Sequence, residues 1–279
     1  MRNRKKWIIY ILIALVTLGW AGKAFEEHSR PAFGLIEIKG PITESMPCLE
    51  TIRDYEEDDS VKAVIVRLDS PGGAVGPSQE IFEALKRLKQ KKPVVASMST
   101  VGASGAYYIA LAADRIFALP GTMTGSIGVI MHFVDASAVL GKIGLKGETV
   151  KSGNLKDAGT PLRPMSSVER HYFESLIQDV QKQFVAAVAT ERRLKPAKVA
   201  ELADGRVYTG RQARQLGLID ELGGYDRAIE YLKHRTGIKD PRIVEPDEDA
   251  GLAEFIAKQL RNEASGLARS AVRLEYSIP

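Results

Sequence analysis

Two glycine-rich turns contain the residues with the clearest capacity for chemistry. Ser70-Pro-Gly-Gly73 and Gly102-Ala-Ser-Gly-Ala106 each follow an apolar run, and the second turn contains the hydroxyl of Ser104. Glycine lets a backbone approach another group closely or adopt a positive φ, and amides at the start of a helix point toward a negative charge. The amides of Gly73 and Gly105 therefore suggest an oxyanion hole beside a serine nucleophile.

Two other interpretations of these turns stay open. Glycine-rich turns that precede helices also bind phosphate, although neither turn has the Walker or the dinucleotide-binding spacing. Small residues also occur where the chain needs only tight packing. The spacing by itself does not choose between packing and catalysis.

A serine nucleophile needs a neighbouring base, and the histidines are weak candidates for it. The sequence contains four of them, at positions 28, 132, 171 and 234. Only His132 follows an apolar segment, residues 126–132, which we expect to be a strand. None of the four lies in a glycine-rich turn, so a Ser-His-Asp triad has little support.

A lysine is the other candidate for the base. The segment Lys151-Ser-Gly-Asn-Leu-Lys-Asp157 is expected to be a loop between a strand at 147–150 and a proline turn at 161–164. A lysine acts as a base only when neutral, so burial or a nearby cation must lower its pKa from about 10.4. The residues alone do not select Lys156 over Lys151 or Lys142.

The scaffold behind these turns is predicted to alternate strands and helices. Short connections between alternating elements indicate crossover units and a mainly parallel sheet, and hence an α/β fold. Strands are expected at 33–38, 61–68, 93–97 and 115–118, and helices at 48–58, 78–89, 105–113 and 166–191.

The net charge of +4 comes from the start of the chain, where Arg2, Arg4, Lys5 and Lys6 lie. Without these four residues, basic and acidic residues balance at 35 each. A nucleic-acid partner is therefore not expected, because it requires basic residues on the folded surface. The single cysteine, Cys48, excludes an intrachain disulfide.

The basic residues precede an uncharged apolar stretch at 7–22. As a helix this stretch spans about 24 Å, somewhat less than a hydrocarbon core of about 30 Å. The positive flank predicts a single-pass anchor with a cytoplasmic N-terminus and a catalytic domain on the extracytoplasmic side. A cleaved signal peptide is the alternative.

The chain is expected to divide into four segments. These are a basic tail with a transmembrane signal anchor at 1–25, a linker at 26–32, a catalytic domain at 33–240 and an amphipathic helical extension at 241–279. The extension has an apolar stripe that steps by three or four residues from Leu252 to Leu274. It packs on its own domain or a neighbour in one interpretation, and on a membrane surface in the other.

Four motifs, in this order, resemble the signal peptide peptidase A family. They are Asp69-Ser-Pro-Gly-Gly73, Ala103-Ser-Gly-Ala-Tyr-Tyr-Ile-Ala110, Thr124-Gly-Ser-Ile-Gly-Val129 and Lys151-Ser-Gly-Asn-Leu-Lys-Asp157. The resemblance extends over residues 33–232, and the joint occurrence is specific where each motif alone is not. The sequence departs from the family pattern at Ala106, where relatives commonly have glycine.

By this resemblance, Ser104 is the nucleophile and Lys156 the general base of a Ser-Lys dyad. Ser126 is the second serine, which hydrogen-bonds the lysine and orients it, and Gly73 and Gly105 supply the oxyanion amides. The implied mechanism of peptide hydrolysis needs no metal and no cofactor.

The resemblance also implies a ClpP/crotonase-type spiral fold in a short, single-domain form. It implies a homo-oligomer on the bacterial cytoplasmic membrane, an octamer in which the serine and lysine of one site come from neighbouring protomers. The implied substrates are signal-peptide remnants and other hydrophobic peptides. Two alternatives remain, a crotonase-like acyl-CoA enzyme, which the anchor and the lysine motif fit less well, and a catalytically silent membrane scaffold.

Overall fold

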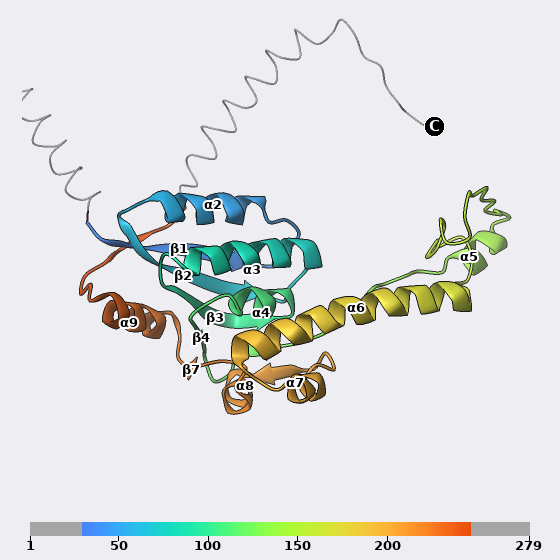
Figure 1. Cartoon of the computed structure of the whole chain (residues 1–279). Coiled ribbons are helices and arrows are strands. Elements are labelled where there is room, and N and C mark those ends of the chain that lie inside the picture. Colours follow the sequence, from blue (N-terminus) through green and yellow to red (C-terminus); the bar gives the residue numbers. More distant parts are fainter. Residues whose placement is uncertain (1–29, 247–279) are drawn as a thin grey trace, which may run out of the picture.

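The computed structural model describes residues 30–246 (Figure 1). The expected N-terminal anchor and most of the expected C-terminal extension therefore lie outside the described residues. Within residues 30–246, none of the helices combines the length and the apolarity that a membrane crossing requires.

One sheet organises the body of the protein. Its described strands follow the order β6-β5-β3-β2-β1-β8, with β4 beside β3 and β7 beside β4. Every pairing among them is parallel except that of β5 with β6. This confirms the predicted α/β class with a mainly parallel sheet, and it fits a ClpP-like fold. The strands are β1 (Ala32–Lys39), β2 (Val61–Ser70), β3 (Val94–Ala103), β4 (Arg115–Ala118), β5 (Met123–Gly125), β6 (Val207–Thr209), β7 (Glu221–Leu222) and β8 (Arg242–Val244).

Helices cover both faces of this sheet (Figure 1). The buried side chains of α2, α3 and α4 belong to the core on one face, and those of α9 to the core on the other. The described helices are α2 (Met46–Glu57), α3 (Val75–Lys89), α4 (Gly105–Ala110), α5 (Ser137–Lys142), α6 (Ser167–Arg192), α7 (Pro196–Leu202), α8 (Gly210–Leu216) and α9 (Tyr225–Thr236).

The first residues after the predicted domain boundary at 240 form a strand of the sheet. These residues do not begin a helical extension, because Arg242–Val244 forms β8 and pairs with β1. Tyr55 of α2 secures this edge, since its hydroxyl lies 2.8 Å from the carbonyl oxygen of Val244 and 3.1 Å from that of Leu35. The sheet of the body therefore includes the first residues of the predicted extension.

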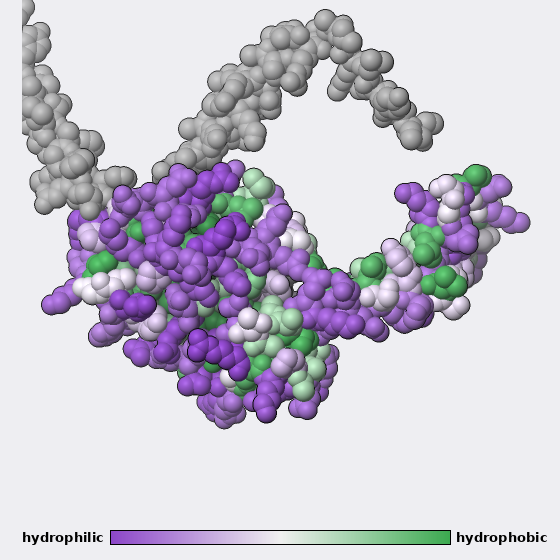
Figure 2. Space-filling view, viewed as in Figure 1, coloured by the Kyte–Doolittle hydropathy of each residue, from purple (hydrophilic) through white to green (hydrophobic). Residues whose placement is uncertain are grey.

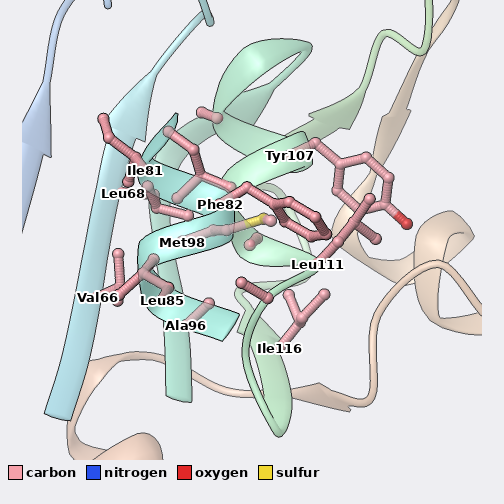
Figure 3. Close-up of a cluster of buried hydrophobic side chains, with 14 of the residues drawn as sticks. Val66, Leu68, Ile81, Phe82, Leu85, Ala96, Met98, Tyr107, Leu111 and Ile116 are labelled. Carbon is pink, nitrogen blue, oxygen red and sulfur yellow. The ribbon is translucent and has the colours of Figure 1, made fainter. Parts of the chain in front are cut away.

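The central strand β2 is apolar on both faces because helices cover both. Val66 and Leu68 lie in the core beneath α3 and α4, whereas Ile65 belongs to the cluster on the α9 side. Figure 3 shows the first of these clusters, where Ile81 of α3 and Tyr107 of α4 pack with the β2 side chains. This packing holds the two glycine-rich turns at one edge of a rigid sheet.

Tyr107 anchors the short helix α4. Its ring is fully buried, and its hydroxyl donates a hydrogen bond of 2.8 Å to the carbonyl oxygen of Leu218. Burial raises the pKa of the Tyr107 hydroxyl, so the group stays neutral and remains a donor. Because α4 begins one residue after Ser104, this anchor also restrains the predicted nucleophile.

The long helix α6 joins the body to a projecting arm, which we define as residues 131–179. At about 1.5 Å per residue, the 26 residues of α6 extend about 39 Å. Its C-terminal end is tied to the body, where Glu191 pairs with Lys86 at 2.9 Å and Arg192 pairs with Asp220 at 2.8 Å. Its N-terminal half lies beyond the sheet and has α5 at its far end (Figure 1). The helix predicted at 166–191 is thus confirmed.

The strand predicted at 126–132 is not formed. β5 is Met123–Gly125, and the chain after it leaves the sheet and joins the arm, where Phe133 packs on Phe173 with ring centroids 4.4 Å apart. Ile130 and Val134 are 75% and 73% exposed. Only the start of this run bonds to neighbouring backbone, where the Ser126 amide donates to Arg206 and the Ile127 carbonyl accepts from Gly205. Among residues 30–246, the rest of the run pairs with no strand. The strand predicted at 147–150 is not formed either.

Candidate active site

Ser104 occupies a sharp turn between β3 and α4. Its φ is 53°, a left-handed conformation that costs a non-glycine residue about 1 kcal/mol or more. Hydrogen bonds hold this turn on both sides: the Ser104 amide donates to the Gly125 carbonyl at 2.8 Å, and its carbonyl accepts from the Tyr108 amide at 2.9 Å. A strained turn from strand to helix presents a serine hydroxyl outward, which is the arrangement of many nucleophiles.

The turn after β2 faces Ser104 and leaves one amide unused. The Ile42 amide donates to Gly72 at 2.9 Å, and the Ala74 amide donates to Ile42 at 2.7 Å. These bonds occupy the Gly72 carbonyl and the Ala74 amide, which flank Gly73. Within the described part of the chain, the Gly73 N–H has no acceptor. It therefore remains available to a ligand.

The two predicted oxyanion donors lie side by side. A Cβ built on Gly105 would sit 3.2 Å from the Gly73 nitrogen and 2.5 Å from the Ser78 hydroxyl oxygen. Parallel pairing of β2 with β3, which aligns Ser70 with Gly102, brings the two turns together. The Gly73 and Gly105 backbones thus lie close together in the pocket that Ser104 lines. Two neighbouring amides beside a nucleophile are what an oxyanion hole requires.

Gly73, Ser104 and Gly105 line one pocket of about 110 Å³. Its far wall includes Tyr108 and Phe184, whose rings meet edge-on with centroids 5.1 Å apart. The mostly apolar walls suit an apolar side chain of a ligand. The remaining lining residues are Val75, Ser78, Gln79, Gly128, Val129, Ile130 and Val180.

Ser126 follows β5 directly, just as Ser104 follows the neighbouring strand β3. Ala103, the last residue of β3, pairs with Gly125, the last residue of β5. The residues that follow these two strands are Ser104 and Ser126. Ser126 shares the unusual backbone of the first serine, with a φ of 49°, and its amide donates to the Arg206 carbonyl at 2.9 Å. Sheet pairing therefore brings four of the predicted site residues, the two serines and the two glycines, to one place.

Lys156 is not among them. It is exposed in the loop between α5 and α6. Figure 1 shows that this loop lies at the end of the arm farthest from the sheet. From Val180, which lines the pocket, α6 continues for about 20 Å to its N-terminus at about 1.5 Å per residue. The lysine of one chain is thus far beyond reach of the serine of the same chain.

The structure separates Lys156 from the nearby Lys151. The Lys151 amine lies 2.5 Å from the Asp157 carboxylate and 3.0 Å from the Asn154 carbonyl oxygen. Among residues 30–246, no acceptor contacts the Lys156 amine. Of these two lysines, only Lys156 is free to engage a partner outside its own chain.

Comparison with known proteins decides the class of enzyme. The model of peptidase family S49 matches residues 86–239, a range that includes both serines and Lys156. A putative protease of Synechocystis sp. is 40% identical, over 80% of this chain and 80% of its own length. The chain belongs to peptidase family S49.

Two further relatives carry more specific names. A putative signal peptide peptidase of Enterococcus faecium is 36% identical to this S49 peptidase, over 72% of this chain and 59% of its own length. A chloroplastic serine protease of Arabidopsis thaliana is 37% identical, over 84% of this chain but only 34% of its own length. These relatives bear out the resemblance to the signal peptide peptidase A family and support a serine protease.

Within residues 30–246, the S49 peptidase has no histidine close to Ser104. His132 is exposed on the arm, and no histidine lines the pocket of Ser104 in the described structure. Within residues 30–246, no group of three or more His, Cys, Asp and Glu side chains has an arrangement that could hold a metal ion.

Several residues around the site were not predicted from the sequence. Ser78 lies against Gly105, and Tyr108 and Phe184 close the pocket. The helical spacing of Val75, Ser78 and Gln79 indicates a shared face, but that pattern is equally typical of a helix that packs in a core. Phe184 carries no local signal, since it comes from α6, eighty residues after the nucleophile.

Gly73→Ala tests the proposed oxyanion geometry. A Cβ at position 73 would lie 2.1 Å from the Ile42 carbonyl oxygen, so the turn must shift and carry its amide with it. We expect kcat for peptide hydrolysis to fall by roughly 100- to 1,000-fold, as when an oxyanion donor is lost. Gly76→Ala is the matched control, because a Cβ there meets nothing within 4 Å. Wild-type kcat in folded Gly73→Ala protein would rule out this donor.

Proposed function

We propose that this S49 peptidase is a membrane-anchored serine endopeptidase that uses Ser104 and Lys156 to degrade cleaved signal peptides and other hydrophobic peptides. The observation that carries the proposal is the strained Ser104 turn beside two amides, in an apolar pocket. The parallel sheet supports the ClpP/crotonase-type spiral fold. The anchor is proposed for residues 7–22, which lie outside the described residues.

The general base in this proposal comes from a neighbouring copy of the chain. The pocket of Ser104 contains no lysine from the described part of its own chain, and Lys156 extends from the arm into solvent. A homo-oligomer in which the arm of one protomer reaches the pocket of the next supplies the missing amine. The octamer implied by the family resemblance would close such a ring.

The surface of the arm supports contact with a second copy. Figure 2 shows apolar residues interspersed with hydrophilic ones on the outer part of the arm, and a second group of apolar residues on the body near the base of the arm. Contiguous exposed apolar surface is typical of an interaction site. The exposed large apolar residues on and next to the arm include Ile130, Val134, Val139, Ile143, Leu145, Val150, Leu155, Leu162 and Val168.

The proposed mechanism assigns each site residue one task. Neutral Lys156 takes the proton of Ser104, and the serine oxygen attacks the peptide carbonyl carbon. The amides of Gly73 and Gly105 hold the oxyanion, and Lys156 then donates its proton to the leaving amine. Ser126 hydrogen-bonds the lysine amine and limits its orientations. Water hydrolyses the acyl-enzyme and releases the second product.

The proposed substrates follow from the pocket and the anchor. A pocket with walls such as Val129, Tyr108 and Phe184 favours apolar side chains. Signal-peptide remnants are short apolar segments that leave or remain in the membrane, close to an anchored protease. In a homo-oligomer, the arms of neighbouring protomers would surround the active sites. Extended peptides would then reach these sites more easily than folded proteins.

Mixing two inactive variants tests this proposal. Ser104→Ala protein retains Lys156, and Lys156→Ala protein retains Ser104, so neither alone has a complete site. In mixed oligomers about a quarter of the sites combine one intact serine with one intact lysine, and peptide hydrolysis should reappear. Native mass spectrometry would verify subunit exchange. A mixture that exchanges subunits but stays inactive would rule out a site shared between protomers.

A further inference from the structure

A chain of ionic contacts links the loop of Lys156 to the start of α6. Asp157, the residue after the lysine, lies 2.5 Å from the Lys151 amine and 3.0 Å from the Arg163 guanidinium. Arg163 also binds both carboxylate oxygens of Glu169, at 2.8 and 2.5 Å. One arginine therefore bridges a carboxylate in the lysine loop and a carboxylate in the first turn of α6.

Glu169 is the fixed end of this chain of contacts. Although the arm is mostly exposed, the residue Glu169 is only 2% exposed. Its carboxylate also accepts from the Ser166 amide at 2.8 Å and the Ser166 hydroxyl at 2.9 Å, which completes the capping box of α6. The Arg163 guanidinium holds the pKa of the Glu169 carboxyl well below its usual range. The Glu169 carboxylate therefore stays ionised at any pH at which a lysine amine can be neutral.

We propose that Arg163 is a positioning residue for Lys156, because it clamps the lysine loop to a helix that is anchored on the body of the protein. This inference rests on the proposed function, which assigns Lys156 as the base. The helix is fixed at its other end through Glu191 and Arg192. Through the Arg163 contacts, the loop at the end of the arm is connected to this anchored helix, while the Lys156 amine has no acceptor among residues 30–246.

Arginine suits this position for a geometric reason. Its planar guanidinium has five donors and can bind two carboxylates at once, whereas a lysine amine is a point charge on a flexible stem. Arg163→Gln removes the charge and the fork. Arg163→Lys keeps only the charge, so it should retain one carboxylate contact rather than two. Its kcat should therefore lie between those of wild type and Arg163→Gln.

The first test is steady-state hydrolysis of a hydrophobic peptide by the full-length oligomer. A misplaced base slows the chemical step, so Arg163→Gln should lower kcat by roughly 10- to 100-fold, with KM changed by less than about threefold. Arg227→Gln is the matched control, because it removes an ion pair with Glu221 on the body. A kcat of Arg163→Gln within about twofold of wild type would overturn the inference.

A second variant covers the case in which Arg163→Gln does not fold. Glu169→Gln keeps the side-chain shape and can still complete a capping box, but it removes the charge that Arg163 binds. It should also lower kcat by roughly 10-fold or more, while the thermal midpoint and the oligomeric state stay close to wild type. Wild-type kcat in this variant would likewise contradict the clamp.

Mixed oligomers separate positioning from general stability. Arg163→Gln is placed either on the Ser104→Ala chain, which supplies the lysine, or on the Lys156→Ala chain, which supplies the serine. The restored activity should fall only in the first case, and equal losses in both would indicate a structural role and reject the inference. Failure of the two proposals is distinguishable: active Lys156→Ala protein contradicts the base itself, whereas inactive Lys156→Ala with normal Arg163→Gln contradicts only the clamp.

Discussion

Ser104→Ala is expected to lower kcat for peptide hydrolysis on the order of 10⁶-fold, as removal of a serine nucleophile does elsewhere. The substitution deletes only the hydroxyl. Backbone bonds to Gly125 and Tyr108 hold the turn, and none of them uses the side chain, so the protein should stay folded and oligomeric. The expected loss is therefore chemical, and only the slow reaction supported by the amides of the pocket should remain.

The measurement combines turnover with covalent labelling. A fluorophosphonate should label the wild-type oligomer at Ser104, which peptide mapping by mass spectrometry identifies, and should not label Ser104→Ala. Ser60→Ala, in the turn before β2 and far from the pocket lining, should label and turn over like wild type. Wild-type oligomer that takes up no label, together with unchanged turnover in Ser104→Ala, would reject Ser104 as the nucleophile. Wild-type oligomer that neither takes up label nor hydrolyses peptide would favour a catalytically silent scaffold.

Lys156→Arg is expected to be as inactive as Lys156→Ala, with a loss of roughly 10⁴-fold or more in kcat. Arginine preserves the positive charge and much of the reach of lysine, but it does not lose a proton near neutral pH. A role in binding or in oligomer contacts would tolerate arginine, whereas a role as proton acceptor would not. The substitution therefore separates an electrostatic role from general-base catalysis.

Lys151→Arg is the matched control for this prediction. Lys151 lies in the same loop and pairs with Asp157, a contact that arginine can maintain. Its kcat should stay within about threefold of wild type, because only the exposed partner of an ion pair changes. Activity of Lys156→Arg close to that of Lys151→Arg would reject the assignment of Lys156 as the base.

Local patterns predicted the central parts of the fold. The apolar run of β2 and the helical spacing of α3 indicate their structures directly, because burial on two faces or on one stripe leaves a short-range period in the sequence. The first residue of α6 follows from its capping residues Ser166 and Glu169. The segment at 126–132 shows the limit of this approach, because an apolar run does not reveal whether a second strand is present to pair with it.

By itself, the sequence determined the elements whose signals are local: the strands that end in glycine-rich turns, the serine within one turn, and the lysine loop before α6. Only the tertiary structure decided which of these meet. The register of β2, β3 and β5 brings Gly73, Ser104 and Ser126 together, whereas the length of α6 carries Lys156 away from them. The physical reason is that register and helix direction depend on contacts between residues far apart in the chain, which leave no periodic signal in any one segment.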